Sequence, residues 1–138
     1  MRTWLVDTGP FVAYLDRSDP QHQAVATMLD AFTGQLATTG AVVTEVMYFL
    51  SDIEDGPAAF AELLLESETR LVNLTTADEI LAATRLMKRY ADTPMDFADA
   101  TLVLLADELG VTDVLTLDRR GFATYRTSKG RPFRLALA

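Results

Sequence analysis

The sequence contains no cysteine and a single histidine, His22. The absence of cysteine excludes disulfides, thiolate zinc sites and cysteine nucleophiles, and we expect a reducing, cytoplasmic location. One histidine cannot supply a histidine cluster for zinc, and a serine–histidine–aspartate triad would have to use His22 itself. Because His22 follows Asp19-Pro20-Gln21, where a loop is expected to pass into a helix, the ordinary interpretation is a lone surface histidine.

Long hydrophobic runs are also missing. No apolar stretch approaches the roughly 20 residues that a membrane-spanning helix needs, and Met1-Arg2-Thr3-Trp4 leads directly into an apolar strand without the features of a signal peptide. We therefore expect no membrane association. The 138 residues, of which 49% are hydrophobic, predict a single folded domain spanning residues 1–138 that is large enough to bury a core.

Charge is unevenly distributed along the chain. The net charge is −8, from 20 acidic and 12 basic residues, and residues 119–138 hold six of the basic residues and none of the acidic ones. An acidic body with a basic C-terminal segment is not typical of a general nucleic-acid binder. This charge distribution is compatible with nucleic-acid binding if a metal ion neutralises the acidic part and the basic segment contacts phosphate. It is equally compatible with a basic protein partner.

Short β-like runs alternate with amphipathic helical segments. The pattern predicts strands at residues 3–6, 35–38, 70–74, 113–117 and 133–137, and helices from residue 8 and at 21–32, 40–50, 58–67, 75–90 and 94–110. This alternation predicts a three-layer α/β/α fold with a central, mainly parallel sheet of four to five strands. In such sheets, ligands bind beyond the carboxyl ends of the strands.

Several acidic residues are expected at that edge of the sheet: Asp7 and Asp118 directly after strands, and Glu45, Asp96 and Asp99 near the starts of helices. Two carboxylates about 5 Å apart repel by roughly 3 kcal/mol at an effective dielectric near 20, so a cluster of them must share protons or bind a cation. Without cysteine and with one histidine, the ligands would be oxygens, which favour Mg²⁺ or Mn²⁺. Such ions assist phosphodiester hydrolysis.

Each acid also has a structural interpretation. Asp7 precedes Thr8-Gly9-Pro10 and fits a helix cap, while Asp118 precedes Arg119-Arg120-Gly121 and fits a turn or cap. Glu45, taken alone, fits a solvated helical acid.

Asp96 and Asp99 lie one helical turn apart in the most informative acidic segment. Asp96 fits the third position of a helix capped by Thr93, where an acid complements the helix dipole. Asp99 precedes the apolar run 101–105, and an acid on the apolar side of a helix is unusual. This position strengthens the functional interpretation of Asp99, but the spacing alone leaves it balanced against a structural one.

Four segments that contain these acids resemble, in order, the motifs of the PIN-domain family, and within it the VapC-like toxins: Leu5-Val6-Asp7-Thr8, residues 39–46, Met95-Asp96-Phe97-Ala98-Asp99-Ala100, and residues 115–122. The third is the most specific. Each segment is short, but four in order with suitable spacing make a strong joint signal. Tyr125-Arg126 and Gly130-Arg131-Pro132-Phe133 also fit one VapC-like subgroup, so that the resemblance spans nearly the whole chain.

The resemblance implies a Mg²⁺-dependent endoribonuclease in which Mn²⁺ can substitute. It implies an acidic catalytic and metal-binding quartet with Asp96 as an accessory acid: Asp7, Glu45, Asp99 and Asp118. Thr8 and Thr116 would support these acids or contact RNA. Arg119, Arg120 and Arg126 would either steer RNA or pair with helical acids.

The family resemblance also implies partners. VapC-like toxins form homodimers and are blocked by a VapB-like antitoxin, which inserts a segment near the acidic pocket. The expected docking surface comprises the third and fourth helices, from Val42 to Leu65, with Tyr48, Phe49 and Phe60. The alternative is that these residues belong to the core or to a dimer interface.

One departure from the family pattern is Gly121, where relatives often carry an acid, and this weakens the expectation of a second metal site. It leaves open a PIN fold that only binds RNA or protein.

A haloacid-dehalogenase-type enzyme would need a second aspartate at position 9, which is glycine. A receiver domain would need a late lysine near the acids, and Lys129 lies beyond the expected place.

Overall fold

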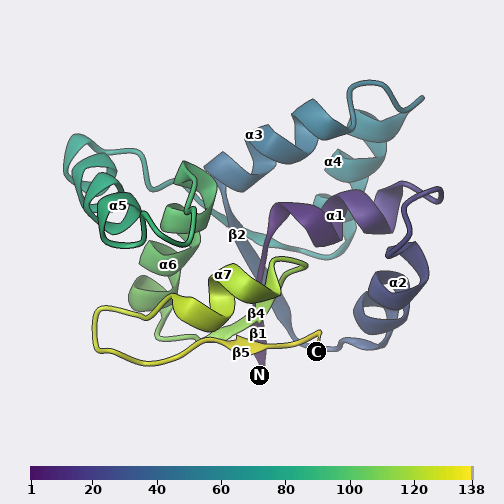
Figure 1. The fold of residues 1–138 in the computed structure, drawn as a ribbon. Coiled ribbons are helices and arrows are strands. Elements are labelled where there is room, and N and C mark those ends of the chain that lie inside the picture. Colours follow the sequence, from purple (N-terminus) through teal and green to yellow (C-terminus); the bar gives the residue numbers. More distant parts are fainter. Residues whose placement is uncertain (138) are drawn as a thin grey trace.

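Five strands and seven helices alternate along residues 1–137, the part of the chain that the computed structural model describes (Figure 1). The strands are β1 (Thr3–Val6), β2 (Gln35–Thr39), β3 (Arg70–Val72), β4 (Asp113–Leu115) and β5 (Arg134–Leu135). The helices are α1 (Thr8–Leu15), α2 (His22–Ala31), α3 (Gly40–Phe49), α4 (Gly56–Glu66), α5 (Ala77–Arg89), α6 (Phe97–Leu109) and α7 (Arg119–Thr124). None of these helices is long and apolar enough to cross a membrane.

All five strands form one parallel sheet in the order β3-β2-β1-β4-β5. The chain moves outward from β1 to β3 and then returns to place β4 beside β1. Because crossover connections are right-handed, α1 to α4 cover one face and α5 to α7 cover the other. Figure 1 shows α1 and α2 on one side of the strands and α5 and α6 on the opposite side. The predicted three-layer α/β/α fold is confirmed, and β1 and β4 form the switch point where ligands bind.

The core lies on both faces of the two central strands. Leu5 and Val6 of β1 and Val114 and Leu115 of β4 are completely buried, as expected for strands covered on both sides. Phe60 of α4 is also completely buried and packs edge-to-face on Phe11, with ring centroids 5.1 Å apart. The expectation that Phe60 belongs to a docking surface is therefore wrong, because it fixes α4 to α1.

The start of α6 differs from the prediction. The helix begins at Phe97, and Asp96 is its cap, so the expected start at a Thr93 cap is wrong. The backbone N–H of Asp99 donates to Asp96 Oδ1 at 2.8 Å, and the backbone N–H of Asp96 donates to Asp99 Oδ2 at 3.2 Å. This reciprocal capping box satisfies two amides at the helix end, which Thr93 could not do from three residues earlier.

The C-terminal third differs in two further respects. Strand β4 ends at Leu115 instead of residue 117, and β5 covers only Arg134–Leu135 instead of residues 133–137. Helix α7 (Arg119–Thr124) was not predicted. Six residues are too few to show a helical period, and Gly121 within them is a poor helix former.

Candidate active site

Asp7 lies between β1 and α1 and is almost completely buried, with 7% of its surface exposed. Its Oδ1 accepts a hydrogen bond from the backbone N–H of Thr8 at 2.8 Å, and its Oδ2 accepts one from the Thr116 hydroxyl at 2.8 Å. Asp7 is thus both a helix cap and a buried acid. The structural and functional interpretations of this residue do not exclude each other.

Thr116 connects the two acids that follow β1 and β4. While its hydroxyl donates to Asp7, it accepts a hydrogen bond from the backbone N–H of Asp118 at 2.9 Å. Asp118 in turn caps α7, because its Oδ1 accepts from the backbone N–H of Gly121 at 3.1 Å. The buried hydroxyl of Thr116 therefore fixes the positions of Asp7 and Asp118 relative to each other.

We expect Thr116→Val to lower the free energy of unfolding by about 1–3 kcal/mol, because Asp7 Oδ2 and the backbone N–H of Asp118 both lose the hydroxyl that they contact. Cleavage of substrate should fall further than the loss of folded protein explains, since Asp7 and Asp118 lose their common support. Thermal unfolding and single-turnover assays at a temperature where the variant is folded separate the two effects. Thr116→Ser retains the hydroxyl and should restore both properties. Equal losses in the valine and serine variants would contradict this role.

Glu45 reaches the site from the second turn of α3. The hydroxyl of Thr8 donates to Glu45 Oε1 at 2.8 Å, which links the start of α1 to α3. Thr8 is therefore a supporting hydroxyl, one of the two roles expected for it. Thr39, at the end of β2, caps α3 and lies 2.8 Å from the hydroxyl of Thr101 in α6. This contact fixes α6, and with it Asp99, against the sheet.

The predicted acids line one cavity of about 400 Å³, whose walls include Asp7, Glu45, Asp96, Asp99 and Asp118. Asp19, from the loop between α1 and α2, also lines it and was missed, because a single Asp-Pro pair in a loop carries no signal for a site. Neither lysine nor arginine is among the residues that line this cavity. Arg119 and Arg120 are exposed on the first turn of α7, directly after Asp118.

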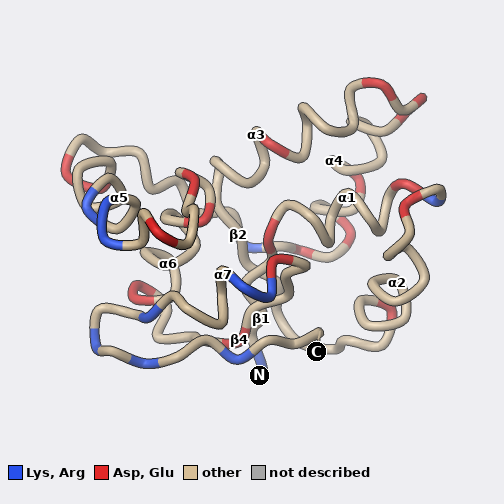
Figure 2. Tube along the Cα trace, viewed as in Figure 1, with Lys and Arg blue, Asp and Glu red and all other residues tan. Residues whose placement is uncertain are grey.

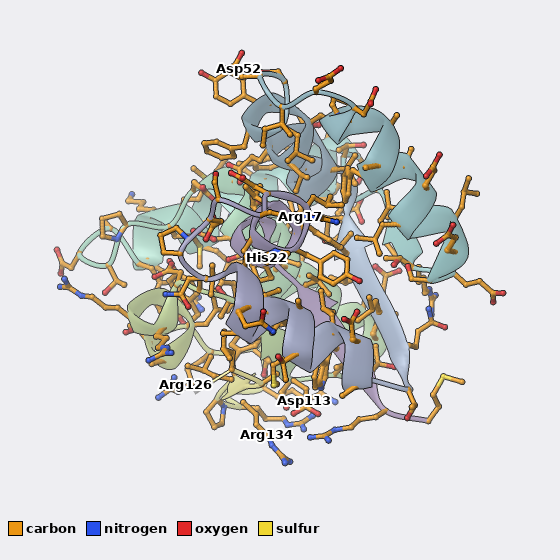
Figure 3. All side chains as sticks on the ribbon, turned by 90° about the vertical axis from the view of Figure 1, so that its right-hand side faces the viewer. Arg17, His22, Asp52, Asp113, Arg126 and Arg134 are labelled. Atoms are coloured by element: carbon orange, nitrogen blue, oxygen red, sulfur yellow. The ribbon has the colours of Figure 1, made fainter. Side chains whose placement is uncertain are left out.

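Burial and mutual repulsion make this cavity unfavourable for negative charge. Burial, followed by the charges of Asp7 and Asp96, raises the pKa of Asp99 from 3.8 to about 8. Burial also raises the pKa of Asp7 and of Glu45 above their ordinary values. In residues 1–137, the ion pairs lie elsewhere: Asp113 pairs with Arg2 at 3.5 Å and with Arg134 at 3.7 Å. Figure 3 shows Asp113 and Arg134 close to each other. A cation in the cavity would relieve the repulsion.

The oxygen-rich lining fits a hard divalent cation. As the side chains stand, no three acidic or histidine residues within 1–137 surround a common point where a metal ion could sit. In this arrangement both oxygens of Asp7 accept hydrogen bonds, and Asp96 and Asp99 cap each other. To complete a coordination shell, side chains of the acids would have to rotate. Asp96 and Asp118 are free to do so because they are exposed.

The family model for the PIN domain matches residues 4–127. The chain belongs to the PIN domain family. Ribonuclease VapC26 of Mycobacterium tuberculosis is 34% identical over 131 residues, which cover 94% of this chain and 96% of that protein. The crystal structure of Mycobacterium tuberculosis VapC20, described as a Sarcin-Ricin loop cleaving toxin, has a TM-score of 0.74 at 21% identity and covers 83% of this chain and 88% of that one. The family predicted from the four motifs is confirmed, and the VapC20 likeness supports the fold.

A steric constraint explains why residue 121 of this PIN domain is glycine. A Cβ at this position would lie 2.3 Å from Asp118 Oδ2 and 2.9 Å from the hydroxyl oxygen of Tyr125. Tyr125 is completely buried, and its hydroxyl donates to the carbonyl of Pro94 at 3.1 Å, so it cannot retreat easily. Glycine here allows Asp118 to fold back onto the first turn of α7. An additional acid at 121 would require a different position for Asp118.

We expect Gly121→Ala to displace the Asp118 carboxylate and to destabilise the PIN domain by about 1–3 kcal/mol through overpacking. Activity should fall more than about tenfold, because Asp118 leaves the position set by Thr116. Thr124→Ala, on the exposed side of the same helix, is the control and should be close to wild type. Wild-type activity in Gly121→Ala would show that this position of Asp118 is not required.

Arg126 has a structural role at the end of α7. Its Nη1 donates to the carbonyl oxygens of Ala123, Thr124 and Tyr125 at 2.9–3.1 Å. These are carbonyls at a helix C-terminus, where positive charge is favourable. Of the three arginines considered for RNA, Arg119 and Arg120 make no ion pair within residues 1–137.

Proposed function

We propose that this PIN domain is a divalent-metal-dependent endoribonuclease that uses Mg²⁺, and that it is the toxin of a cytoplasmic toxin–antitoxin pair. The observation that carries the proposal is the convergence of Asp7, Glu45, Asp96, Asp99 and Asp118 on one cavity whose lining holds no basic residue. The 34% identity to a protein named a ribonuclease, over almost the full length of both chains, supports it.

The proposed roles of the acids follow the family motifs in which they lie. Asp7, Asp99 and Asp118 would hold the cation, with Asp96 at the rim as an accessory ligand. Once bound, a divalent cation lowers the pKa of water and stabilises negative charge on phosphate. Glu45, whose burial raises its pKa, would orient the attacking water and accept its proton, since a pKa nearer neutrality suits a general base.

The start of α7 supplies positive charge beside the cavity. Arg119 and Arg120 directly follow Asp118 and are exposed, and Figure 2 shows basic positions next to the acidic one at this helix start. The other basic positions of the C-terminal segment follow the lower edge of the molecule in Figure 2. We propose that Arg119 and Arg120 contact RNA phosphates on either side of the cleaved bond. The attraction between arginine and phosphate charges would supply most of the binding energy of these contacts.

An exposed aromatic pair on α3 supports the proposed partners. Tyr48 and Phe49 are 74% and 56% exposed, and their rings lie edge-to-face with centroids 5.5 Å apart. Phe49 also lines the acidic cavity. Exposed aromatic residues are enriched at protein interfaces, so we propose that a VapB-like antitoxin covers this pair. A homodimer would use another face, which leaves the cavity accessible.

The test is incubation of purified protein with total cellular RNA in Mg²⁺ and, in parallel, in a chelator. Sequencing of the new RNA ends identifies cleavage sites. We expect a small number of discrete cuts that require the divalent cation. If every RNA stays intact at high protein excess, in Mg²⁺ and in Mn²⁺, the domain is a binding protein and the proposed activity is wrong.

A further inference from the structure

A second cavity adjoins the acidic one and has a different chemistry. Its volume is about 630 Å³, and Glu45 and Asp96 line both cavities. The walls come from the start of α3, the segment after β3 and the start of α6. It therefore lies at the carboxyl ends of β2 and β3, on the edge of a parallel sheet where ligands bind. Its volume is in the range of small-molecule sites.

We propose that this cavity binds one nucleobase of a single-stranded RNA segment whose neighbouring phosphate lies at the acidic cavity. The inference rests on the proposed ribonuclease function and adds the element that selects sequence. Because Glu45 and Asp96 form the boundary between the two cavities, a strand held at the acids brings its next base to the second cavity. We call this second cavity the base cavity.

The residues that line the base cavity favour an uncharged ligand. Lysine and arginine are absent from its lining, and the two carboxylates at its boundary repel phosphate. Besides small residues, the lining includes an aromatic residue, an amide and hydroxyls, contributed by Phe97, Asn73, Thr44 and Thr75. Phe97 is half-buried, packs against the core and lines the cavity. Proteins recognise unpaired bases by stacking them on such rings.

Asn73 is placed to read the edge of a base. It follows β3 directly, it is exposed, and its amide makes no hydrogen bond to any other group in residues 1–137. Its Oδ1 lies over Gly40, because a Cβ at residue 40 would approach that oxygen to 2.4 Å. Glycine at the start of α3 thus lets the amide lie across the helix end. An amide offers a donor and an acceptor side by side, which is the pairing pattern of a base edge.

A protein segment is the alternative occupant of the base cavity. The exposed aromatic pair of α3, Tyr48 and Phe49, offers apolar area for a protein, but neither residue lines this cavity. The base cavity offers one partly covered ring among polar groups. That composition favours a base over an apolar peptide side chain, so RNA is the occupant that we test.

The test measures equilibrium binding of short, labelled single-stranded oligonucleotides of each of the four bases in Mg²⁺, so that the acids that repel phosphate are neutralised. The oligonucleotides carry non-hydrolysable linkages, so that no cleavage occurs. Stacking on an aromatic ring stabilises a bound base whatever its identity. Phe97→Leu keeps an apolar side chain and should weaken binding of every oligonucleotide by about 5- to 10-fold. Asn73→Asp replaces a donor with an acceptor and should change the order of affinities among the four bases. Gln23→Glu, on exposed α2, adds the same charge elsewhere and serves as the control.

Thermal unfolding of each variant confirms that it is folded before binding is compared. The proposal is overturned if both variants bind all four oligonucleotides within about twofold of wild type, or if the order of affinities is the same in Asn73→Asp and in wild type. If wild type cleaves RNA and the variants leave cleavage sites and affinities unchanged, only the base cavity is wrong. If wild type neither binds nor cleaves RNA, but Asn73→Asp releases a protein partner, both the base cavity and the ribonuclease function are wrong.

Discussion

Replacement of Asp7 by asparagine is expected to abolish RNA cleavage, by about 10³-fold or more, while the protein stays folded. A metal ligand supplies several kcal/mol of charge stabilisation in the transition state, and each 1.4 kcal/mol is a factor of ten in rate. The fold should survive because the amide keeps an oxygen for the backbone N–H of Thr8 and a polar contact to Thr116. The free energy of unfolding should be equal to wild type or about 1 kcal/mol higher, since a buried charge is removed.

The matched control for this experiment is Asp78→Asn, an exposed acid in the first turn of α5. It makes the same chemical change outside the cavity and should leave cleavage unchanged. Single-turnover cleavage and thermal unfolding are measured for both variants. Metal-dependent cleavage that persists in Asp7→Asn would remove this residue from the site.

The metal-free protein is expected to lose stability progressively as the pH rises from about 4 to about 8. The pKa of Asp99 is about 8 in the folded state against 3.8 for the free side chain, so the folded state binds the additional proton between these values. Stability from this group is therefore fully present below pH 4 and is lost as the pH approaches 8. Because solvent reaches the cavity and screens the repulsion, we expect a loss of about 1–2 kcal/mol.

Denaturant unfolding at several pH values, in a chelator and in millimolar Mg²⁺, measures this loss. Bound cation should remove most of the pH dependence, because it replaces the proton as the neutralising charge. Asp99→Asn should show a flatter profile than wild type in the chelator. An identical pH profile in the two proteins would show that Asp99 does not carry a raised pKa.

Most of the fold followed from local patterns. The strand at residues 3–6 is as predicted, and the helix predicted at residues 75–90 is α5 (Ala77–Arg89), which begins with a capping box between Thr76 and Glu79. Adjacent parallel strands then bring Asp7 and Asp118 to one edge, which the alternation of strands and helices implied. The sequence could therefore indicate that these acids converge, and the cavity that they line agrees with this.

What the sequence did not reveal depends on contacts between distant residues. Asp19 joins the cavity through a loop whose path is set by the packing of α1 on α2. Helix α7 was missed because its stability comes from the buried Phe122 and Tyr125 instead of from a periodic pattern. The sequence around Phe60 does not distinguish a core aromatic residue from an exposed one at an interface. Its contact with Phe11 shows that Phe60 belongs to the core.

The most direct test of the central claim is calorimetric titration of Mg²⁺ and Mn²⁺ into the wild-type protein and into Asp99→Asn. Wild type should bind a divalent cation, and Asp99→Asn should lose most of this binding while remaining folded, because Asp99 lies among the acids of one cavity. Equal binding by both proteins would place the metal elsewhere. No binding to wild type at millimolar metal, with and without a bound RNA oligonucleotide, would contradict the claim that these acids form a metal site.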